Sequence, residues 1–224
     1  MRRRWRYSGG MFTLSAPLLL RAYAAGIFPM AESAESQELH WFDPEQRGIL
    51  PLDRFHVPRS LRKTVRRGVF ELRFDSAFRR VMEMCAETTE VRPKTWINAD
   101  IIRLYTELFH AGYAHSVECW RDGRLVGGLY GVSIGAAYFG ESMFSRETDA
   151  SKVALVHLVA RLRAAGFTLL DTQFVTDHLS HFGAEEIPRA EYHRRLNDAL
   201  DRSTDFPAVD QARAVAALLD GLSG

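Results

Sequence analysis

The stretch that decides the predicted fold is AHSVECWRDGRLVGGLYGVSIGAAYFGESMFS, residues 114–145. Apolar and polar residues alternate along it, which is typical of β-strands. Asp122-Gly123 marks one tight turn and Gly135 a second. The stretch therefore predicts three consecutive antiparallel strands.

A helix and a fourth strand follow. Asp149 is expected to open a helix whose apolar residues recur at helical spacing, and Gly166 ends it. LLDTQ, residues 169–173, then indicates a strand. Two strands of one sheet joined through a helix run parallel. We therefore predict an α/β domain with a mixed sheet over residues 91–224.

The first 90 residues predict a smaller α+β domain. Pro44, Pro51 and Pro58 indicate extended segments and turns. Ser60 can cap a short basic helix, and Asp75 is expected to cap the next one. At the other end of the chain an amphipathic helix docked on its own domain is predicted by Val209, Ala212, Ala216 and Leu219.

Composition indicates a soluble globular protein with a sizeable core: 224 residues, 46% hydrophobic and 25% charged. The net charge of +1 argues neither for nor against a nucleic-acid partner. Basic residues do gather, however, near the N-terminus and in the predicted helix after Pro58. Such clusters are either phosphate-binding patches or solvated helix faces. Their members are Arg2, Arg3, Arg4, Arg6, Arg59, Arg62, Lys63, Arg66 and Arg67.

The chain is expected to be cytoplasmic. Cys85 and Cys119 lack metal-ligand spacing, and two isolated cysteines fit a reducing compartment. Arg21 interrupts the apolar run near the N-terminus, so an export signal is not expected. No stretch approaches the roughly 18 apolar residues that span a bilayer.

The strand at 169–173 carries polar residues toward its end. Asp171 and Gln173 are two apart, so they share one face. On the preceding strand, Phe139, Glu141 and Met143 alternate onto one face. If these strands are neighbours, both acids and the amide could line a crevice at their carboxyl ends, where α/β sheets bind ligands. The alternative is a pair of structural carboxylates.

Other kinds of site are not predicted. His157, His178 and His181 lack partners that would complete a metal set. There is no G-x-G-x-x-G, Walker loop or nucleophile elbow. Neither a metal, a bound cofactor nor a covalent nucleophile is therefore expected.

Several segments together resemble the leucyl/phenylalanyl-tRNA–protein transferase family, in the same order along the chain. They are YAAGIFPM (23–30), TWI (95–97), the 115–135 strand pair, GESMFSRETDASKVAL (140–155) and LLDTQFVTDHLSHFGAEEIPRAEY (169–192). Two positions depart from the family pattern. Met30 stands where tryptophan is usual, and Asp43 stands in place of the serine of W-x-S-P.

The resemblance implies a reaction and a fold. Such enzymes move leucine or phenylalanine, and less well methionine, from aminoacyl-tRNA to an N-terminal arginine or lysine of a protein. The product is marked for N-end-rule degradation. The family's catalytic domain has an N-acetyltransferase-like (GNAT) fold and uses no cofactor. A monomer without membrane contact is expected.

The resemblance implies the catalytic centre, and strand alternation and the needs of the reaction indicate the other site residues. Asp171 and Gln173 form the catalytic centre, with Asp171 either accepting the proton or only positioning groups. Glu141 binds the α-ammonium group of the aminoacyl moiety or orients the site. The side-chain pocket is expected from Leu129, Tyr138, Met143 and Leu170, and the acceptor's basic side chain meets Glu185 or Glu186. For the tRNA we expect Arg62, Lys63, Arg66 and Arg67.

Two rival functions remain open from the residues themselves. A non-catalytic RNA-binding module would share the basic clusters without needing Glu141, Asp171 and Gln173 together. An acyl-CoA acetyltransferase would need a pyrophosphate-binding loop, whereas SRETDAS occupies residues 145–151.

Overall fold

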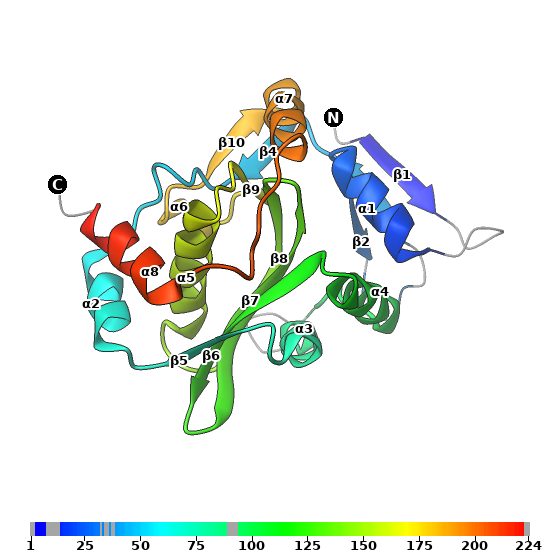
Figure 1. Ribbon diagram of the computed structural model, residues 1–224. Coiled ribbons are helices and arrows are strands. Elements are labelled where there is room, and N and C mark those ends of the chain that lie inside the picture. Colours follow the sequence, from blue (N-terminus) through cyan, green and yellow to red (C-terminus); the bar gives the residue numbers. More distant parts are fainter. Residues whose placement is uncertain are drawn as a thin grey trace.

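The computed structural model describes residues 3–7, 14–31, 33, 36, 39–88 and 94–221. Within these ranges the strands form two sheets (Figure 1). The smaller sheet has the order β1-β3-β2 and is antiparallel throughout. Its strands are β1 (Arg3–Tyr7), β2 (Phe28–Ala31) and β3 (Leu39–Asp43), and helix α1 (Ala16–Ala24) precedes β2.

The larger sheet has seven strands in the order β10-β4-β9-β8-β7-β6-β5. Strands β6, β7 and β8 are antiparallel neighbours, and β8 pairs in parallel with β9, so both predictions are confirmed. The sheet is therefore mixed. Its strands are β4 (Gln46–Ile49), β5 (Glu71–Phe74), β6 (Ala114–Arg121), β7 (Arg124–Ile134), β8 (Ala137–Ser145), β9 (Leu169–Gln173) and β10 (Glu185–Pro188).

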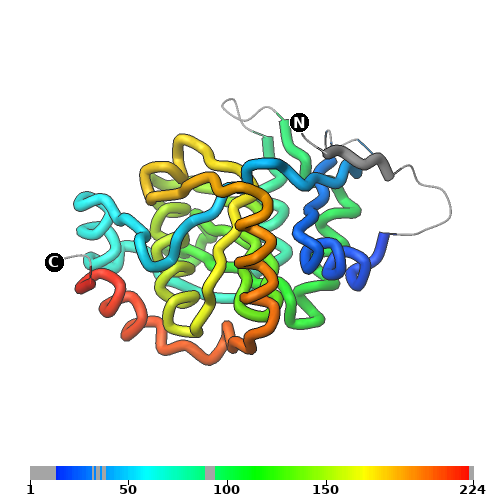
Figure 2. Tube along the Cα trace, turned by 90° about the horizontal axis from the view of Figure 1, so that it is seen from above, coloured from blue at the N-terminus to red at the C-terminus, as the bar shows by residue number. Residues whose placement is uncertain are grey.

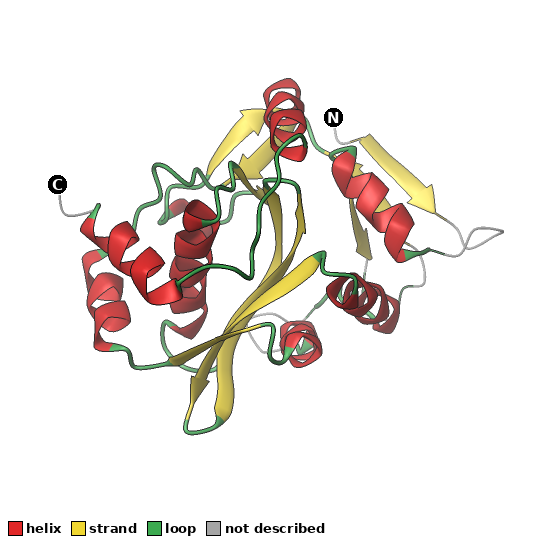
Figure 3. Ribbon diagram, viewed as in Figure 1, coloured by secondary structure: helices red, strands yellow, loops and turns green. Residues whose placement is uncertain are grey.

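Helices cover both faces of this sheet (Figure 3). One face packs against α2 (Arg59–Arg67), α5 (Ala150–Ala164) and α8 (Gln211–Asp220); the other packs against α1, α3 (Phe78–Ala86), α4 (Ala99–His110) and α7 (Arg189–Leu200). The short helix α6 (Asp177–Ser180) follows β9. Nowhere in the described ranges is a helix both long and apolar enough to cross a bilayer.

The start of α5 lies directly against β7. A Cβ atom on Gly127 would stand 2.4 Å from the Cβ of Ala150, closer than side chains pack, so only glycine fits there. This close approach fixes the first turn of α5 beside the end of β8.

The start of α3 differs from the prediction. Asp75 does not cap it; the residue adopts φ 57° and accepts a hydrogen bond from the Ser116 backbone N–H at 2.7 Å. Instead, Glu118 on β6 accepts from the backbone N–H groups of Ser76 (3.0 Å) and Ala77 (2.8 Å). Glu118, which is far from α3 in sequence, thus accepts the hydrogen bonds that Asp75 was expected to accept.

The larger sheet draws strands from both halves of the chain. β5 pairs with β6, and β4 pairs with both β9 and β10. A boundary at residue 90 would separate β5 from its hydrogen-bonded neighbour β6. The chain before residue 90 therefore contributes directly to the sheet that carries residues 114–173.

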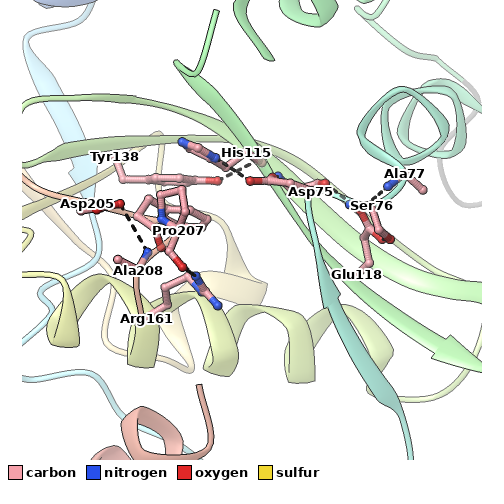
Figure 4. Close-up of polar contacts among 12 residues, drawn as sticks. Asp75, Ser76, Ala77, His115, Glu118, Tyr138, Arg161, Asp205, Pro207 and Ala208 are labelled. Carbon is pink, nitrogen blue, oxygen red and sulfur yellow. Dashed lines mark hydrogen bonds and ion pairs between the residues drawn. The ribbon is translucent and has the colours of Figure 1, made fainter. Parts of the chain in front are cut away.

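The C-terminal segment is docked on its own domain, as predicted, but through a different helix face. Helix α8 buries Ala214, Leu218 and Leu219 rather than Ala212 and Ala216. It lies beside α2 (Figure 2). Before α8, the guanidinium of the buried Arg161 donates to the carbonyl oxygens of Phe206 (2.7 Å) and Pro207 (3.3 Å). Figure 4 shows Arg161 beside Pro207.

Candidate active site

The candidate site lies where β8 and β9 separate. Their parallel pairing ends at Phe139 and Asp171, whereas β8 continues to Ser145. At the same place the β7–β8 register shifts, so that Glu141 lies in a bulge between Gly140 and Ser142. A cavity of about 730 Å³ opens there. Bulges redirect side chains and are frequent beside active sites.

The cavity has an apolar wall on the α5 side of the sheet. Leu129, Met143 and Leu170, three of the four residues predicted for the side-chain pocket, line it together with Leu155 and Leu158 of α5. The other side of the sheet contributes further apolar and aromatic groups. They include Phe28, Pro29, Met30, Met84, Trp96 and Phe174.

Tyr138, the fourth predicted pocket residue, does not line the cavity. It lies where β8 is still paired with β9, opposite Leu170, and the cavity opens only beyond that pairing. Its hydroxyl donates to the carbonyl oxygen of His115 (3.2 Å), and its ring stacks on Phe206 at 5.8 Å. Simple alternation could not show this, because it does not report where along β8 the pairing with β9 ends.

The same bulge corrects the predicted face of Glu141. Phe139 packs in the core against α4, whereas Met143 packs on the α5 side, so the two do not share a face with Glu141 between them. Glu141 is half-buried and lines the cavity. Its carboxylate accepts hydrogen bonds from the hydroxyls of Tyr23 (2.6 Å) and Tyr105 (3.3 Å).

The surroundings of the Glu141 carboxyl favour its protonated form. Burial raises its pKa to about 8, the Asp171 charge also raises it, and the hydrogen bonds from Tyr23 and Tyr105 act in the opposite direction. A proton held at this position can leave when a cationic group binds next to it. The end of the cavity that holds Glu141 can therefore become negatively charged when a cationic group binds there.

Gln173 is the second polar group at this end of the cavity. It is 8% exposed and lines the cavity, and its Nε2 has no hydrogen-bond partner among the described residues. Its backbone adopts φ 57°, a left-handed conformation that costs roughly 1–3 kcal/mol for a residue other than glycine. Such strain persists where the surroundings enforce it, and it occurs often at functional sites.

Asp171 lies behind the cavity wall rather than in it. It is 0% exposed, and its carboxylate accepts from the Nε (2.9 Å) and Nη2 (2.6 Å) of Arg47 and from the hydroxyl of Tyr192 (2.8 Å). A further hydrogen bond comes from the backbone N–H of Gln173 (2.8 Å). The site thus brings Glu141 and Gln173 to the cavity and leaves Asp171 one layer behind.

The remaining predicted residues lie outside the cavity lining. Glu185 is on β10, where it pairs with Arg54 at 2.7 Å, and Glu186 is exposed next to it. Arg62, Lys63, Arg66 and Arg67 lie on α2. Helix α2 begins beside a smaller cavity of about 280 Å³ lined by Ser60, Lys152 and His178, and His178 also lines the main cavity. Arg2 lies outside the described residues.

Most of the chain is similar to one family of known proteins. The family model described as leucyl/phenylalanyl-tRNA protein transferase matches residues 49–197, and the model of that family's N-terminal domain matches residues 12–45. The chain belongs to this family. The resemblance inferred from the sequence is confirmed, and the chain is an aminoacyltransferase by family membership.

Curated relatives agree. The leucyl/phenylalanyl-tRNA–protein transferase of Paramagnetospirillum magneticum is 65% identical over 88% of this chain and 94% of its own. That of Phenylobacterium zucineum is 60% identical over 87% and 88%. A solved C-terminal domain of a putative lysylphosphatidylglycerol synthetase from Agrobacterium fabrum aligns at 12% identity with 92% of this chain and 69% of its own, with a TM-score of 0.40, too low to support an inference.

The two departures from the family pattern have different surroundings. Met30 lines the cavity, so the usual tryptophan is replaced at a position that shapes it. Asp43 lies away from the cavity, with its carboxylate 3.8 Å from Arg189 and 3.5 Å from His193. Of the two, Met30 alone touches the space available to a substrate.

Four residues of the site were not singled out from the sequence: Tyr23, Arg47, Tyr105 and Tyr192. Tyr23 and Tyr192 lie at the ends of segments that carry the family resemblance, so a signal was present. Tyr105 has the helical spacing of the other buried residues of α4, so it looks like an ordinary core position. Arg47 gave no local signal, because it meets Asp171 across 124 residues of sequence.

Proposed function

We propose that this chain transfers leucine or phenylalanine, and less well methionine, from aminoacyl-tRNA to the N-terminal arginine or lysine of a protein. The observation that carries the proposal is the cavity between β8 and β9. One wall is apolar and suits a leucine or phenylalanine side chain, and its polar end holds Glu141 and Gln173. A chain of this family uses aminoacyl-tRNA and protein substrates.

The reaction is aminolysis of an ester. The free α-amine of the acceptor protein attacks the carbonyl carbon of the aminoacyl group, a C–N bond forms, and the C–O bond to the 3′-terminal ribose breaks. The proton lost by the amine ends on the departing ribose oxygen. Catalysis then depends on positioning the amine, moving its proton and stabilising the oxyanion.

We assign contact with the attacking amine to Gln173. Its side chain lines the cavity, and an amide oxygen there can accept a hydrogen bond from an amine N–H. Direct proton acceptance by Asp171 is not supported, because its carboxylate is 0% exposed and already accepts four hydrogen bonds, from Arg47, Tyr192 and Gln173. A positioning role for Asp171, with the proton carried by a ribose hydroxyl, fits better.

We assign Glu141 to the α-ammonium group of the aminoacyl moiety. An arriving cation would lower the pKa of Glu141 from about 8, so that the side chain ionises to the carboxylate. Leu129, Met143 and Leu170 would contact the amino-acid side chain, and Met143 suits both leucine and phenylalanine because thioethers adapt to different shapes. We keep Glu185 or Glu186 for the acceptor's basic side chain as a weaker proposal.

The fold proposed for this reaction is GNAT-like. A parallel strand pair, β8 and β9, that separates where the substrate binds supports it, together with their crossover helix α5, which starts beside the opening. For the tRNA acceptor stem we propose α2, whose exposed Lys63, Arg66 and Arg67 lie on the helix that begins next to the smaller cavity. Phosphate contacts release counterions, so tRNA binding should weaken steeply with salt.

The deciding experiment incubates the protein with radiolabelled Leu-tRNA and two peptides that differ only in starting with Arg or with Asp. Label is expected on the Arg peptide and not on the Asp peptide, since like charges cost several kcal/mol at a close contact. Gln173→Ala is the matched variant and should lower transfer by about 10²-fold, because the attacking amine loses the group that positions it. Absence of transfer by the wild-type protein, with tRNA binding retained, would favour the non-catalytic RNA-binding alternative.

A further inference from the structure

Groups from three elements meet on the carboxylate of Asp171, behind the cavity. Arg47 comes from β4, Tyr192 from α7 and the Gln173 backbone from the end of β9. Arg47 is 1% exposed, Tyr192 0% and Gln173 8%, so the whole group is shielded from water. Buried charges need this degree of pairing, because an unpaired one is expensive.

Arg47 is itself held by three hydrogen bonds and two ring contacts. Its guanidinium lies 4.5 Å from the ring centre of Phe28 and 4.4 Å from that of Tyr192. Nη1 donates to the carbonyl oxygen of Gly26 at 2.9 Å, while Nε and Nη2 form the two bonds to Asp171. A planar guanidinium that forms these hydrogen bonds and two ring contacts fixes the carboxylate in position and orientation.

The carboxylate in turn fixes Gln173. The same Oδ1 that accepts from Arg47 Nε accepts from the Gln173 backbone N–H at 2.8 Å. That bond holds the residue in its left-handed conformation, from which its amide reaches the cavity. Gly48 of β4 permits the turn, since a Cβ there would come within 2.5 Å of the Phe174 backbone.

We propose that Arg47 and Tyr192 are positioning residues for the transfer reaction, acting through Asp171 on the direction in which the Gln173 amide points. Neither lines the cavity, so neither is expected to touch a substrate. The inference rests on the proposed function. It predicts that loosening this support changes turnover more than substrate affinity.

The test uses Tyr192→Phe, which removes one hydroxyl and keeps the ring over Arg47. A slight misplacement of a catalytic group from outside the site can cost up to about 100-fold, so we expect kcat to fall about tenfold, with KM for Leu-tRNA changed less than twofold. Tyr113→Phe, at the exposed Tyr113, is the matched control and should leave both constants unchanged. Arg47→Lys, which keeps the charge but loses the fork, should lower kcat further.

A double-mutant cycle distinguishes positioning from general stability. If Tyr192 acts through Gln173, Tyr192→Phe should have less than a twofold effect in a Gln173→Ala background. The same tenfold loss in both backgrounds, or an unchanged kcat in Tyr192→Phe alone, would overturn the inference.

A second measurement does not depend on activity. Amide hydrogen exchange at Gln173 should become about tenfold faster in Tyr192→Phe, while the amides of β6 and β7 keep their protection. Unchanged exchange at Gln173 refutes the positioning role. Wild-type protein that fails to transfer label refutes the proposed function instead, and the exchange result then still decides whether Tyr192 holds Gln173 in place.

Discussion

Two glutamates of the larger sheet, Glu118 on β6 and Glu141 on β8, are bound very differently. Glu118 is 0% exposed and accepts five hydrogen bonds, from two backbone N–H groups, two serine hydroxyls and the indole of Trp120. Figure 4 shows it beside Ser76 and Ala77 at the start of α3. Glu141 accepts from two tyrosine hydroxyls and faces the cavity.

The difference separates a structural acid from a functional one. Backbone N–H groups and an indole are donors whose positions the fold fixes, so the fold itself supplies the hydrogen bonds that stabilise the Glu118 carboxylate. Glu141 has fewer donors, and burial raises its pKa to about 8. Burial alone therefore does not mark a site; burial with incomplete compensation beside an open cavity does.

The largest expected effect concerns Glu118 and the stability of the fold. Glu118→Ala should lower the free energy of unfolding by about 3–5 kcal/mol, because it leaves several buried donors, including the Ser76 and Ala77 N–H groups, without an acceptor. Urea denaturation measures this, with Glu118→Gln expected to lose less. A loss below about 1 kcal/mol in Glu118→Ala would mean that the comparison misjudges Glu118.

Glu141→Gln should affect activity strongly and stability little. The side chain keeps its size and both tyrosine hydroxyls keep a partner, so we expect the free energy of unfolding at pH 7 to change by less than about 1 kcal/mol. Without a carboxylate to meet the α-ammonium group, kcat/KM for Leu-tRNA should fall about 10–100-fold. Label transfer at full rate by this variant would remove Glu141 from the proposed site.

The pH dependence of stability sharpens the comparison further. The folded-state pKa of Glu141, about 8, lies above its ordinary value of 4.5, so between these values the native protein holds a proton that the unfolded chain has released. Its contribution to stability is therefore fully present at low pH and is lost as pH rises toward about 8.

Between pH 6 and pH 9, wild-type protein should lose roughly 2–3 kcal/mol relative to Glu141→Gln, which cannot titrate at this position. Urea denaturation of both proteins across this range measures the difference. A difference that stays constant with pH would show that Glu141 is already ionised in the empty cavity.

Much of the sheet could be predicted because its signals are local. The turns at Asp122-Gly123 and Gly135, and the helix after Asp149, give the order and direction of four strands. Each of these features needs only a few neighbouring residues to be recognised.

The site could be predicted less completely, because its geometry depends on a bulge and on distant pairing. Two-residue alternation along β8 fails at Glu141, where the register shifts, so Met143 does not share the face of Phe139. Tyr138 was misplaced because β8 and β9 separate only beyond it. The partners of Asp171 come from β4 and α7, and no periodicity reports that Arg47 and Tyr192 will meet it.

The smallest expected effects distinguish the two hydroxyls on Glu141. Tyr23 donates at 2.6 Å and Tyr105 at 3.3 Å, and a short bond to a carboxylate is much the stronger. We expect kcat/KM to fall about fivefold in Tyr23→Phe and about twofold or less in Tyr105→Phe.

Both bonds lower the pKa of Glu141, so each variant should move the acid limb of the pH–rate profile to higher pH, Tyr23→Phe by more. Rates measured from pH 6 to 9, with Tyr113→Phe as the control, test the order. If the two variants shift the profile equally, or not at all, the hydroxyls do not set the protonation of Glu141, and its distinction from Glu118 would rest on its place at the open cavity.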